Sequence, residues 1–360
     1  MISFILFEIL TYTHKEIKSQ ADIPIEDLYK FSHVNHPNTI YKKSDLERAK
    51  RNVELFEWAA TRNRSIINSA KYILRYFNDS FIQKFIPRTT PSTTTFCPNC
   101  YATGKNWHAN GDWSWSYQNP DVIKCNVCGM QFPNAQYPET LRIKSTWDPE
   151  QEFSYVDNDP VQCMSYKVCR SSMEGVIRGK KLTFLVNQLL NLALGYFVSN
   201  DSEYAKYVQK ALFRLAEVMP KYLVYAGYSY SEYCDVDPHE AVKDPSKVDK
   251  FIFAPGNEEK TGLYHTYWAA SRLGTSGMDG QIVKILAQAY DLTVDAVDLD
   301  GKPIYSEEDK VFISKNCLIE GALLGFYDTL INNKAVYNRQ GVALVGLATG
   351  STLMTRFGMD

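Results

Sequence analysis

The sequence has almost no excess of charge of either sign. Its 360 residues include 39 Lys and Arg against 41 Asp and Glu, which gives a formal net charge of -2. A chain this close to neutral produces no overall field that attracts nucleic acid or an anionic membrane. Any contact with a polyanion must therefore be local, and we expect no nucleic-acid partner.

The sequence also lacks an uninterrupted run of the roughly 20 apolar residues that cross a bilayer. The longest candidate, residues 182–198, is broken by Asn187, Gln188 and Asn191. The N-terminus is apolar but short, contains Glu8, and has neither a basic leader nor a small-residue cleavage site, so it does not establish a signal peptide. We expect no membrane span.

No exact repeat and no low-complexity tract is visible, so helical periodicity is the main structural signal. Apolar residues at spacings of three and four predict helices at residues 44–77, 181–198, 203–218, 281–290, 306–330 and 339–357. The chain is 45% hydrophobic and can bury a sizeable core. Helices paired through short turns favour a mainly α fold in an α/α arrangement over a coiled coil.

Helix starts are marked by capping signals, and two long segments lack helical periodicity. Ser44 with Glu47, and Ser306 with Asp309, have the spacing of capping boxes. The segment from residue 87 to about 138 is rich in Pro, Thr, Gly, Asn and Trp, and predicts an irregular insert with short strands.

Four of the eight cysteines form two Cys-x-x-Cys pairs: Cys97, Cys100, Cys125 and Cys128. Each pair places two thiolates on a tight turn, and two facing turns close a tetrahedral zinc site. Four cysteines leave no open coordination position, so the predicted zinc is structural. Two local disulfides or free thiols are the alternatives.

The two pairs depart slightly from a standard zinc ribbon. Gly129 follows the second pair, whereas Tyr101 stands where the first pair would have its glycine, and 24 residues separate the pairs. Between them, Lys105 and Lys124 are the only cations, which is a poor footprint for phosphate. A ribbon that binds nucleic acid is therefore disfavoured.

Several further segments resemble one known family. They are His-Pro-Asn-Thr-Ile-Tyr (36–41), Gln-Phe-Pro-Asn (131–134) after a Cys-x-x-Cys-Gly, Ala-Ala-Ser-Arg-Leu-Gly (269–274), Ala-Gln-Ala-Tyr-Asp-Leu (287–292) and Asn-Asn-Lys-Ala-Val-Tyr-Asn (332–338) before a small-residue helix at 341–350. Together they are similar to segments of heparinase II/III-like polysaccharide lyases. The resemblance spans most of residues 36–360.

The resemblance implies an (α/α) toroid. It divides the chain into an N-terminal helical segment at 1–88, a zinc-ribbon insert at 89–140 and a partial toroid at 141–360. In the family, the tyrosine and histidine that move protons lie downstream of the asparagine segment. We therefore expect the toroid to be incomplete at the C-terminus and the catalytic acid and base to be missing from this chain.

β-Elimination explains why asparagines would be useful at residues 332 and 333. The reaction removes a proton α to the carboxylate of a uronic acid, and amide donors that neutralise this carboxylate lower the barrier. Asn332 and Asn333 are the predicted catalytic residues. Lys334 stands where the family commonly has histidine and would pair with the carboxylate. An ordinary helix cap or turn is the alternative for the two asparagines.

The long stretch at residues 222–280 is poorly periodic and rich in aromatics, and long loops in compact domains are usually functional. The predicted substrate-binding residues are Lys334, Tyr337, Arg272 and, from this stretch, Tyr228, Tyr230, Tyr264, His265 and Trp268. A packed loop is the alternative, and for His265 alone it is favoured over catalysis.

The resemblance implies an acidic, uronate-containing polysaccharide as partner and a periplasmic or extracellular location. The alternative function, from a different class, is a non-catalytic glycan-binding or interaction protein on an α/α scaffold.

Overall fold

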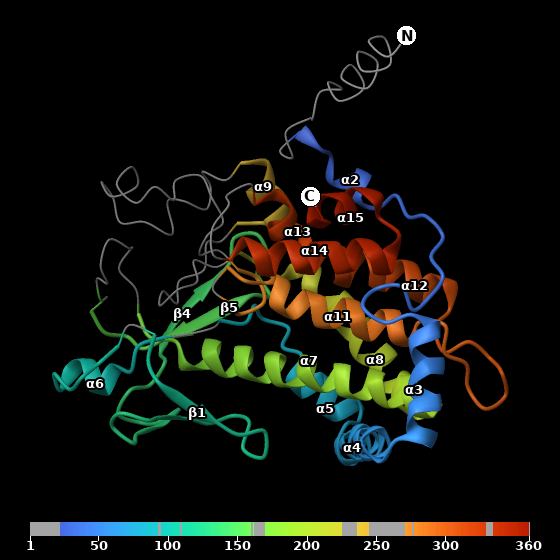
Figure 1. The fold of residues 1–360 in the computed structure, drawn as a ribbon. Coiled ribbons are helices and arrows are strands. Elements are labelled where there is room, and N and C mark those ends of the chain that lie inside the picture. Colours follow the sequence, from blue (N-terminus) through green and yellow to red (C-terminus); the bar gives the residue numbers. More distant parts are fainter. Residues whose placement is uncertain are drawn as a thin grey trace, which may run out of the picture.

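The computed structural model describes residues 22–92, 95–108, 110–159, 161, 170–224, 236–244, 271–275, 277–328 and 334–359. Within these residues the protein is mainly helical, as predicted, with short strands confined to the segment between the first and second groups of helices (Figure 1).

The longest helix, α7 (Met173–Ser199), is the centre of the helical body. Ser172 caps its first turn by accepting a hydrogen bond from the Gly175 amide, and Asn200 ends it in the left-handed conformation, with φ of 58°. After this turn, α8 (Ser202–Val218) runs back along α7 and ends in the single 3-10 turn η2 (Met219–Lys221). The predicted helix pair is confirmed, although α7 begins eight residues before the predicted start.

Within the described residues, α7 is also a helix long and apolar enough to cross a membrane, by length and composition alone. Its buried residues Leu182, Leu185, Leu189 and Leu192 belong to the main hydrophobic core, and α7 contacts α4, α8 and α11. These are the surroundings of a core helix in a helical protein.

Above α7, the helices α11 (Gly280–Thr293) and α14 (Ala335–Thr349) are stacked in successive layers (Figure 1). Glycines allow α11 and α14 to approach: a Cβ on Gly280 would lie 2.1 Å from the carbonyl oxygen of Tyr337, and one on Gly341 would lie 2.6 Å from the Gly280 Cα. The C-terminal α15 (Thr352–Met359) then packs on α14.

The predicted helix at 306–330 is present as one continuous rod with an unexpected centre. It consists of α12 (Glu307–Ile313), a π-helical segment η4 (Ser314–Ile319) and α13 (Glu320–Tyr327). The predicted capping box is confirmed, because Ser306 and Asp309 each accept the other's backbone amide. No periodicity in the sequence indicated the wider turn of η4.

Of the described N-terminal helices, the first packs on α15 and the next three contact α7. They are α2 (Ile25–Leu28), α3 (Lys43–Leu55), α4 (Glu57–Leu74) and α5 (Asp79–Phe85). The predicted capping box of Ser44 and Glu47 is wrong by two residues: α3 begins at Lys43, and the Asp45 carboxylate accepts the Lys42 amide at 2.8 Å. The short helix α9 (Pro238–Lys243) packs on α13.

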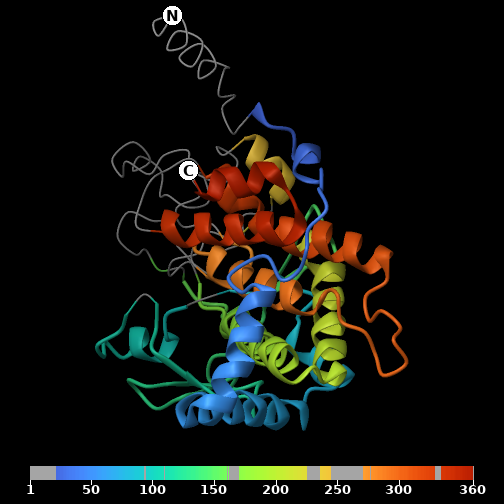
Figure 2. The same cartoon turned by 45° about the vertical axis from the view of Figure 1, so that its right-hand side comes forward.

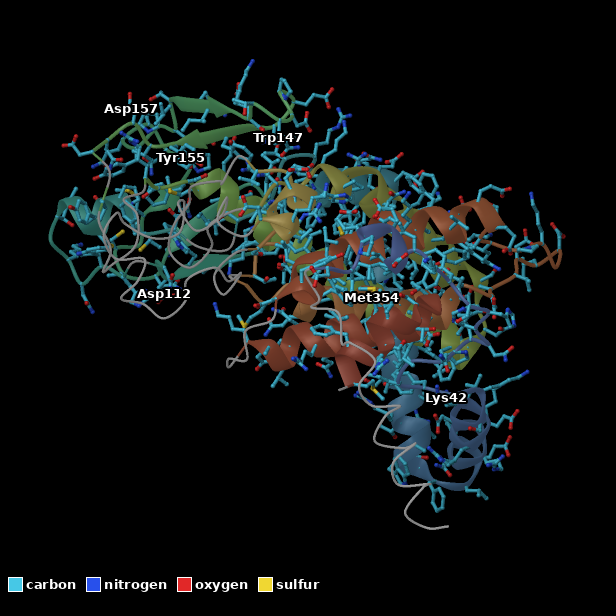
Figure 3. All side chains as sticks on the ribbon, turned by 90° about the horizontal axis from the view of Figure 1, so that it is seen from above. Lys42, Asp112, Trp147, Tyr155, Asp157 and Met354 are labelled. Atoms are coloured by element: carbon cyan, nitrogen blue, oxygen red, sulfur yellow. The ribbon has the colours of Figure 1, made fainter. Side chains whose placement is uncertain are left out.

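The non-helical segment contains two small antiparallel sheets. The first has the strand order β1 (Trp113–Trp115), β2 (Ile123–Cys125), β3 (Gln131–Phe132) and follows the short helix α6 (Pro98–Ala102). The second is a hairpin of β4 (Leu141–Lys144) and β5 (Glu152–Tyr155), in which Leu141 pairs with Tyr155. This hairpin, which includes the labelled Trp147 and Tyr155 (Figure 3), falls inside the range that the sequence assigned to the helical toroid.

The segment at residues 95–137, here called the ribbon, is docked on the helical body (Figure 2). Asp121 forms ion pairs with Lys84 of α5 at 2.8 Å and with Lys181 of α7 at 2.5 Å. The ring of Trp115 lies against Phe85 and Phe184. The ribbon therefore shares its packing with the helices instead of standing apart.

Candidate metal centre

The structure brings together the sulfur atoms of the four cysteines that were predicted to bind zinc. The Sγ atoms of Cys97 and Cys128 are 3.7 Å apart, as are those of Cys100 and Cys125, and all four lie within 4.8 Å of one another. Zn–S bonds of about 2.3 Å in a tetrahedron place the sulfurs about 3.8 Å apart. None of the four is in a disulfide, so the geometry is that of a tetrathiolate cluster able to bind a metal ion.

Each half of the cluster is shaped by its own turn. Cys97 precedes α6 with Pro98 at the first helical position, and the Tyr101 amide bonds to the Cys97 carbonyl at 3.1 Å. Because Tyr101 stays in the helical conformation, this turn has no need of the glycine that a standard ribbon has here. Its left-handed residue comes later, at Gly104, with φ of 62°.

The second turn follows the standard pattern. The Gly129 amide bonds to the Cys125 carbonyl at 2.9 Å, and the Cys125 amide bonds to the Met130 carbonyl at 2.9 Å, which closes the chain around the sulfurs. Gly129 has φ of 78°, a conformation that side chains other than glycine rarely adopt. From the sequence, a glycine is expected after a Cys-x-x-Cys pair because backbone amides must wrap around the thiolates; the positive φ is a second reason, which the structure adds.

The cysteines differ in their surroundings. Burial raises the pKa of Cys97 and raises that of Cys100 to about 11. Burial also acts on Cys128, but hydrogen bonds from the Met130 amide and the Asn99 side chain outweigh it and lower the pKa of Cys128 to about 7. Since metal binding requires thiolates, binding at neutral pH must release protons from the buried thiols.

Asn99 is a supporting residue that the sequence interpretation missed. Its Oδ1 accepts a hydrogen bond from the Tyr137 hydroxyl at 3.2 Å, which orients its amide nitrogen toward Cys128. The only signal in the sequence was a polar residue inside the first Cys-x-x-Cys. Around the cluster, an apolar shell comprises Ile123, Phe132, Val156, Met173 and Val176.

Two of the predicted lyase residues lie at the start of α14. Lys334 is 5% exposed, and burial lowers its pKa to about 8. Tyr337, one turn later, is 39% exposed. Asn332 and Asn333, the predicted catalytic pair, lie outside the residues that the structure describes.

Arg272 is buried at 1% exposure, and its guanidinium bonds to groups of the protein itself. It donates to the carbonyls of Tyr222, Met219 and Glu320 and to the Glu320 carboxylate at 3.0 Å. A substrate contact by Arg272 stays a prediction, and its observed role is to anchor the chain. The other predicted substrate-binding residues, Tyr228, Tyr230, Tyr264, His265 and Trp268, lie outside the described residues.

The partners of Glu320 form a buried polar cluster that the sequence did not indicate. Its carboxylate also bonds to His239 at 2.6 Å and accepts the Tyr29 hydroxyl at 3.3 Å. The hydrogen bond to Glu320 raises the pKa of His239. Residues this far apart in the chain have no common motif, so only the fold reveals the cluster.

Comparisons with protein-family models, with curated proteins and with solved structures found no match for this chain.

Proposed function

We propose that the chain is a carbohydrate-active protein of the heparinase II/III-like polysaccharide lyase type, built on an (α/α) toroid and acting on uronate-containing polysaccharide by β-elimination. One observation supports this proposal above others: three of the segments that carry the resemblance, at residues 36–41, 287–292 and 341–350, contact one another in the fold.

Asp291 of the Ala-Tyr-Asp-Leu segment is the meeting point. His36 Nδ1 lies 2.7 Å from its carboxylate, and the Thr39 hydroxyl donates to it at 2.6 Å. Asn38 donates its backbone amide to Asp291 and its side-chain amide to the Leu347 carbonyl on α14. Burial acts to raise the pKa of Asp291, but these hydrogen bonds hold it below its usual value. The carboxylate therefore ties the His-Pro-Asn-Thr run to α11, and Asn38 ties the same run to α14.

The chemistry proposed for residues 332–334 follows from their position before α14. Asn332 and Asn333 would donate to the uronate carboxylate and reduce its charge as the α-proton leaves. Lys334 is a better candidate for proton transfer than a solvent-exposed lysine, because its pKa of about 8 lies near the working pH of most enzymes. Burial of the Lys334 side chain is what lowers this pKa.

We further propose that the cysteine cluster binds zinc and that this zinc is structural. Four thiolates in tetrahedral spacing suit zinc, and no coordination position is left for substrate or water. The ion would hold the two turns of the ribbon together and would take no part in bond cleavage.

The lyase proposal is tested by incubating the protein with a panel of uronate polysaccharides and following ultraviolet absorbance from unsaturated uronate ends. In place of the tyrosine and histidine of the family, Lys334 would accept the α-proton in this chain. We therefore expect absorbance to rise on at least one polysaccharide and the rise to fall at least tenfold in Asn333→Ala. New reducing ends without absorbance would indicate hydrolysis and contradict the proposal. Retention of a polysaccharide without cleavage would favour the non-catalytic glycan-binding alternative.

A further inference from the structure

A groove on the surface of the helical body runs between α4 and α7 and is closed at one end by the ribbon. Its volume is about 760 Å³. Among the described residues, neither Lys334, Tyr337 or Arg272 of the predicted lyase site nor any cysteine of the cluster lines it. It is therefore a separate candidate site, formed by elements that the sequence interpretation treated as scaffold.

One wall is the exposed face of α4. Thr61, Arg64, Asn68 and Tyr72 follow one another at helical spacing along the groove. From Thr61 to Tyr72 the helix rises about 16 Å at about 1.5 Å per residue. This wall is polar along most of its length and aromatic at the end near the ribbon.

The opposite wall comes from α7. It presents Phe184, Gln188 and Asn191, which recur at spacings of four and three. Asn191 donates to the Gln188 side-chain oxygen at 3.2 Å, so the two amides are held in a fixed relation. Gln188 and Asn191 are two of the polar residues that interrupt the apolar run of this helix. Both line the groove.

The aromatic end is built from three elements. Tyr117 of the ribbon stacks on Phe184 of α7 with centroids 4.9 Å apart and an interplanar angle of 11°, and on Tyr76 at 5.2 Å. Its hydroxyl lies 2.9 Å from that of Tyr72, which is 51% exposed. The platform is thus preformed, and rings held in this way lose little freedom when a ligand binds.

We infer that this groove binds a segment of an unsulfated oligosaccharide chain. Sugar hydroxyls both donate and accept hydrogen bonds, as do the amides and hydroxyls of Asn68, Gln188, Asn191 and Thr61. The C–H faces of a pyranose ring pack on aromatic rings such as Tyr72. The combination of planar amides with an aromatic platform suits this ligand.

The charge of the groove argues against more anionic ligands. Among the described residues that line the groove, Arg64 is the only cation, and it is paired with Glu57 at 2.6 Å. Nucleic acids and heavily sulfated chains are bound through several cations, and their binding weakens steeply with salt. One partly neutralised arginine matches a chain with few charges.

The inference does not depend on the lyase proposal, because binding in the groove requires no chemistry at residues 332–334. It does depend on the ribbon, which supplies Tyr117. Loss of the metal would therefore weaken binding by releasing one side of the aromatic platform.

The test uses the whole chain on an array of unsulfated oligosaccharides, with heparin hexasaccharide and a random peptide library as comparisons. Any unsulfated ligand that is retained is then titrated calorimetrically. We expect Tyr72→Ala and Asn68→Ala each to weaken its binding at least tenfold. Both side chains are exposed, so both variants should fold, which circular dichroism verifies.

Trp147→Ala is the matched control. Trp147 is an aromatic residue, 53% exposed, on the β4–β5 hairpin, and it lies outside the groove (Figure 3). Its replacement should leave binding unchanged. Failure of every unsulfated oligosaccharide to bind, binding that is indifferent to Tyr72→Ala and Asn68→Ala, or preference for heparin or for peptides would each overturn the inference. Retained binding with no cleavage would leave it standing and contradict only the lyase proposal.

Discussion

Cys100 and Cys125 face each other across the two turns of the ribbon, 3.7 Å apart, and each belongs to a different Cys-x-x-Cys pair. A metal bound here would therefore join two turns that are separated by 24 residues in the chain. Removing one cysteine ligand should therefore release the metal and remove the link between the two turns.

At this scale, the first prediction concerns Cys125→Ser. We expect the wild-type chain to contain about one zinc ion, and the variant to lose its zinc or to bind it at least roughly tenfold more weakly, because three thiolates and a hydroxyl make a poorer site. Mass spectrometry of the metal and competition with a chromogenic chelator measure this. Cys317→Ala is the control, since Cys317 is buried in η4 and away from the cluster. Full zinc content in Cys125→Ser would contradict the assignment.

The second prediction concerns the pH dependence of stability at Lys334. Its pKa is about 8 in the folded protein and close to 10.5 when exposed, so the folded state binds fewer protons between these values and its stability rises with pH there. Below pH 8 the buried charge costs roughly 1–3 kcal/mol. Lys334→Met should therefore stabilise the protein at pH 7, and the gain should fade as pH rises from 8 to about 10.5.

Urea unfolding at several pH values measures this difference. Lys302 is exposed, so Lys302→Met controls for the loss of a lysine that is not buried. A gain for Lys334→Met that stays constant up to pH 10.5 would show that the ammonium group is not destabilised by burial.

The individual residues show how far a sequence can specify a site. The four cysteines of the cluster were predictable because metal coordination fixes both residue type and local spacing. Asn99, which bonds to Cys128, and the partners of Arg272 were not, because hydrogen bonds in a fold join residues with no fixed separation. Gly129 fits the sequence pattern of a zinc ribbon, whereas its positive φ is visible only in the structure.

Among the elements, the rod formed by α12, η4 and α13 differs most from expectation. Its π-helical segment ends immediately before Glu320. The Glu320 carboxylate bonds to Arg272, His239 and Tyr29. Burial acts to raise the pKa of Glu320, but His239 and Arg272 hold it below its usual value. The charge is therefore kept in the core by its partners.

The third prediction follows from this pairing. Arg272→Met leaves the Glu320 carboxylate without its buried cation and should destabilise the protein by about 3–5 kcal/mol. Arg272→Met combined with Glu320→Leu should cost less than the sum of the two single changes. Urea unfolding of the four proteins gives the coupling free energy. A cost below about 1 kcal/mol for Arg272→Met would contradict the anchoring role and leave substrate binding as the better explanation of Arg272.

The fourth prediction concerns the crossing of α11 and α14. Gly341→Ala should destabilise the protein by about 2–3 kcal/mol or more, because its new methyl group would meet the Gly280 backbone, which cannot move aside cheaply. Gly325→Ala is the matched helical control: its methyl group would lie 3.3 Å from the Asn338 side chain, so the cost should be smaller. Equal thermal shifts for the two variants would argue against a backbone contact at the crossing.

Helices were predicted better than their interruptions. Apolar spacing located α7, α8, α11 and the rod, because periodic burial is a property of each helix alone. The π-helical segment, the β4–β5 hairpin and the early start of α7 depend on what packs against them. That information is spread over the chain and is not periodic.

At the scale of the whole molecule, the ribbon and the helical body have separate apolar cores that meet at aromatic residues packed against both, Trp107 and Trp115. The ribbon contacts α4, α5 and α7 through Trp115, Tyr117 and Asp121. The sequence indicated an insert at residues 89–140 because its composition differs from that of the helices. The amino-acid composition of a segment indicates its local structure. Whether the ribbon packs on the helices depends instead on pairs of surface residues that come from different elements.

The fifth prediction tests this coupling. Chelation of the metal under reducing conditions should speed amide hydrogen exchange in residues 95–137 and in the first turns of α7, whereas α11 and α14 should keep their protection because their core lies elsewhere. Mass spectrometry of exchanged peptides resolves the segments. Exchange that increases uniformly along the chain, or that does not change in the ribbon, would contradict a local structural role for the metal.

The position of α7 also limits how this protein can be divided by recombination or engineering. The first turns of α7 supply Met173, Val176 and Ile177 to the apolar shell around the cysteine cluster, and its later turns supply Leu185 and Leu192 to the helical core. A cut at residue 140, where composition suggests a boundary, would leave the ribbon without one wall of its own interior. The transferable unit is therefore the ribbon together with α7 and the helices that hold α7, and a graft of the cysteine segment alone would transplant the ligands without the shell that encloses them.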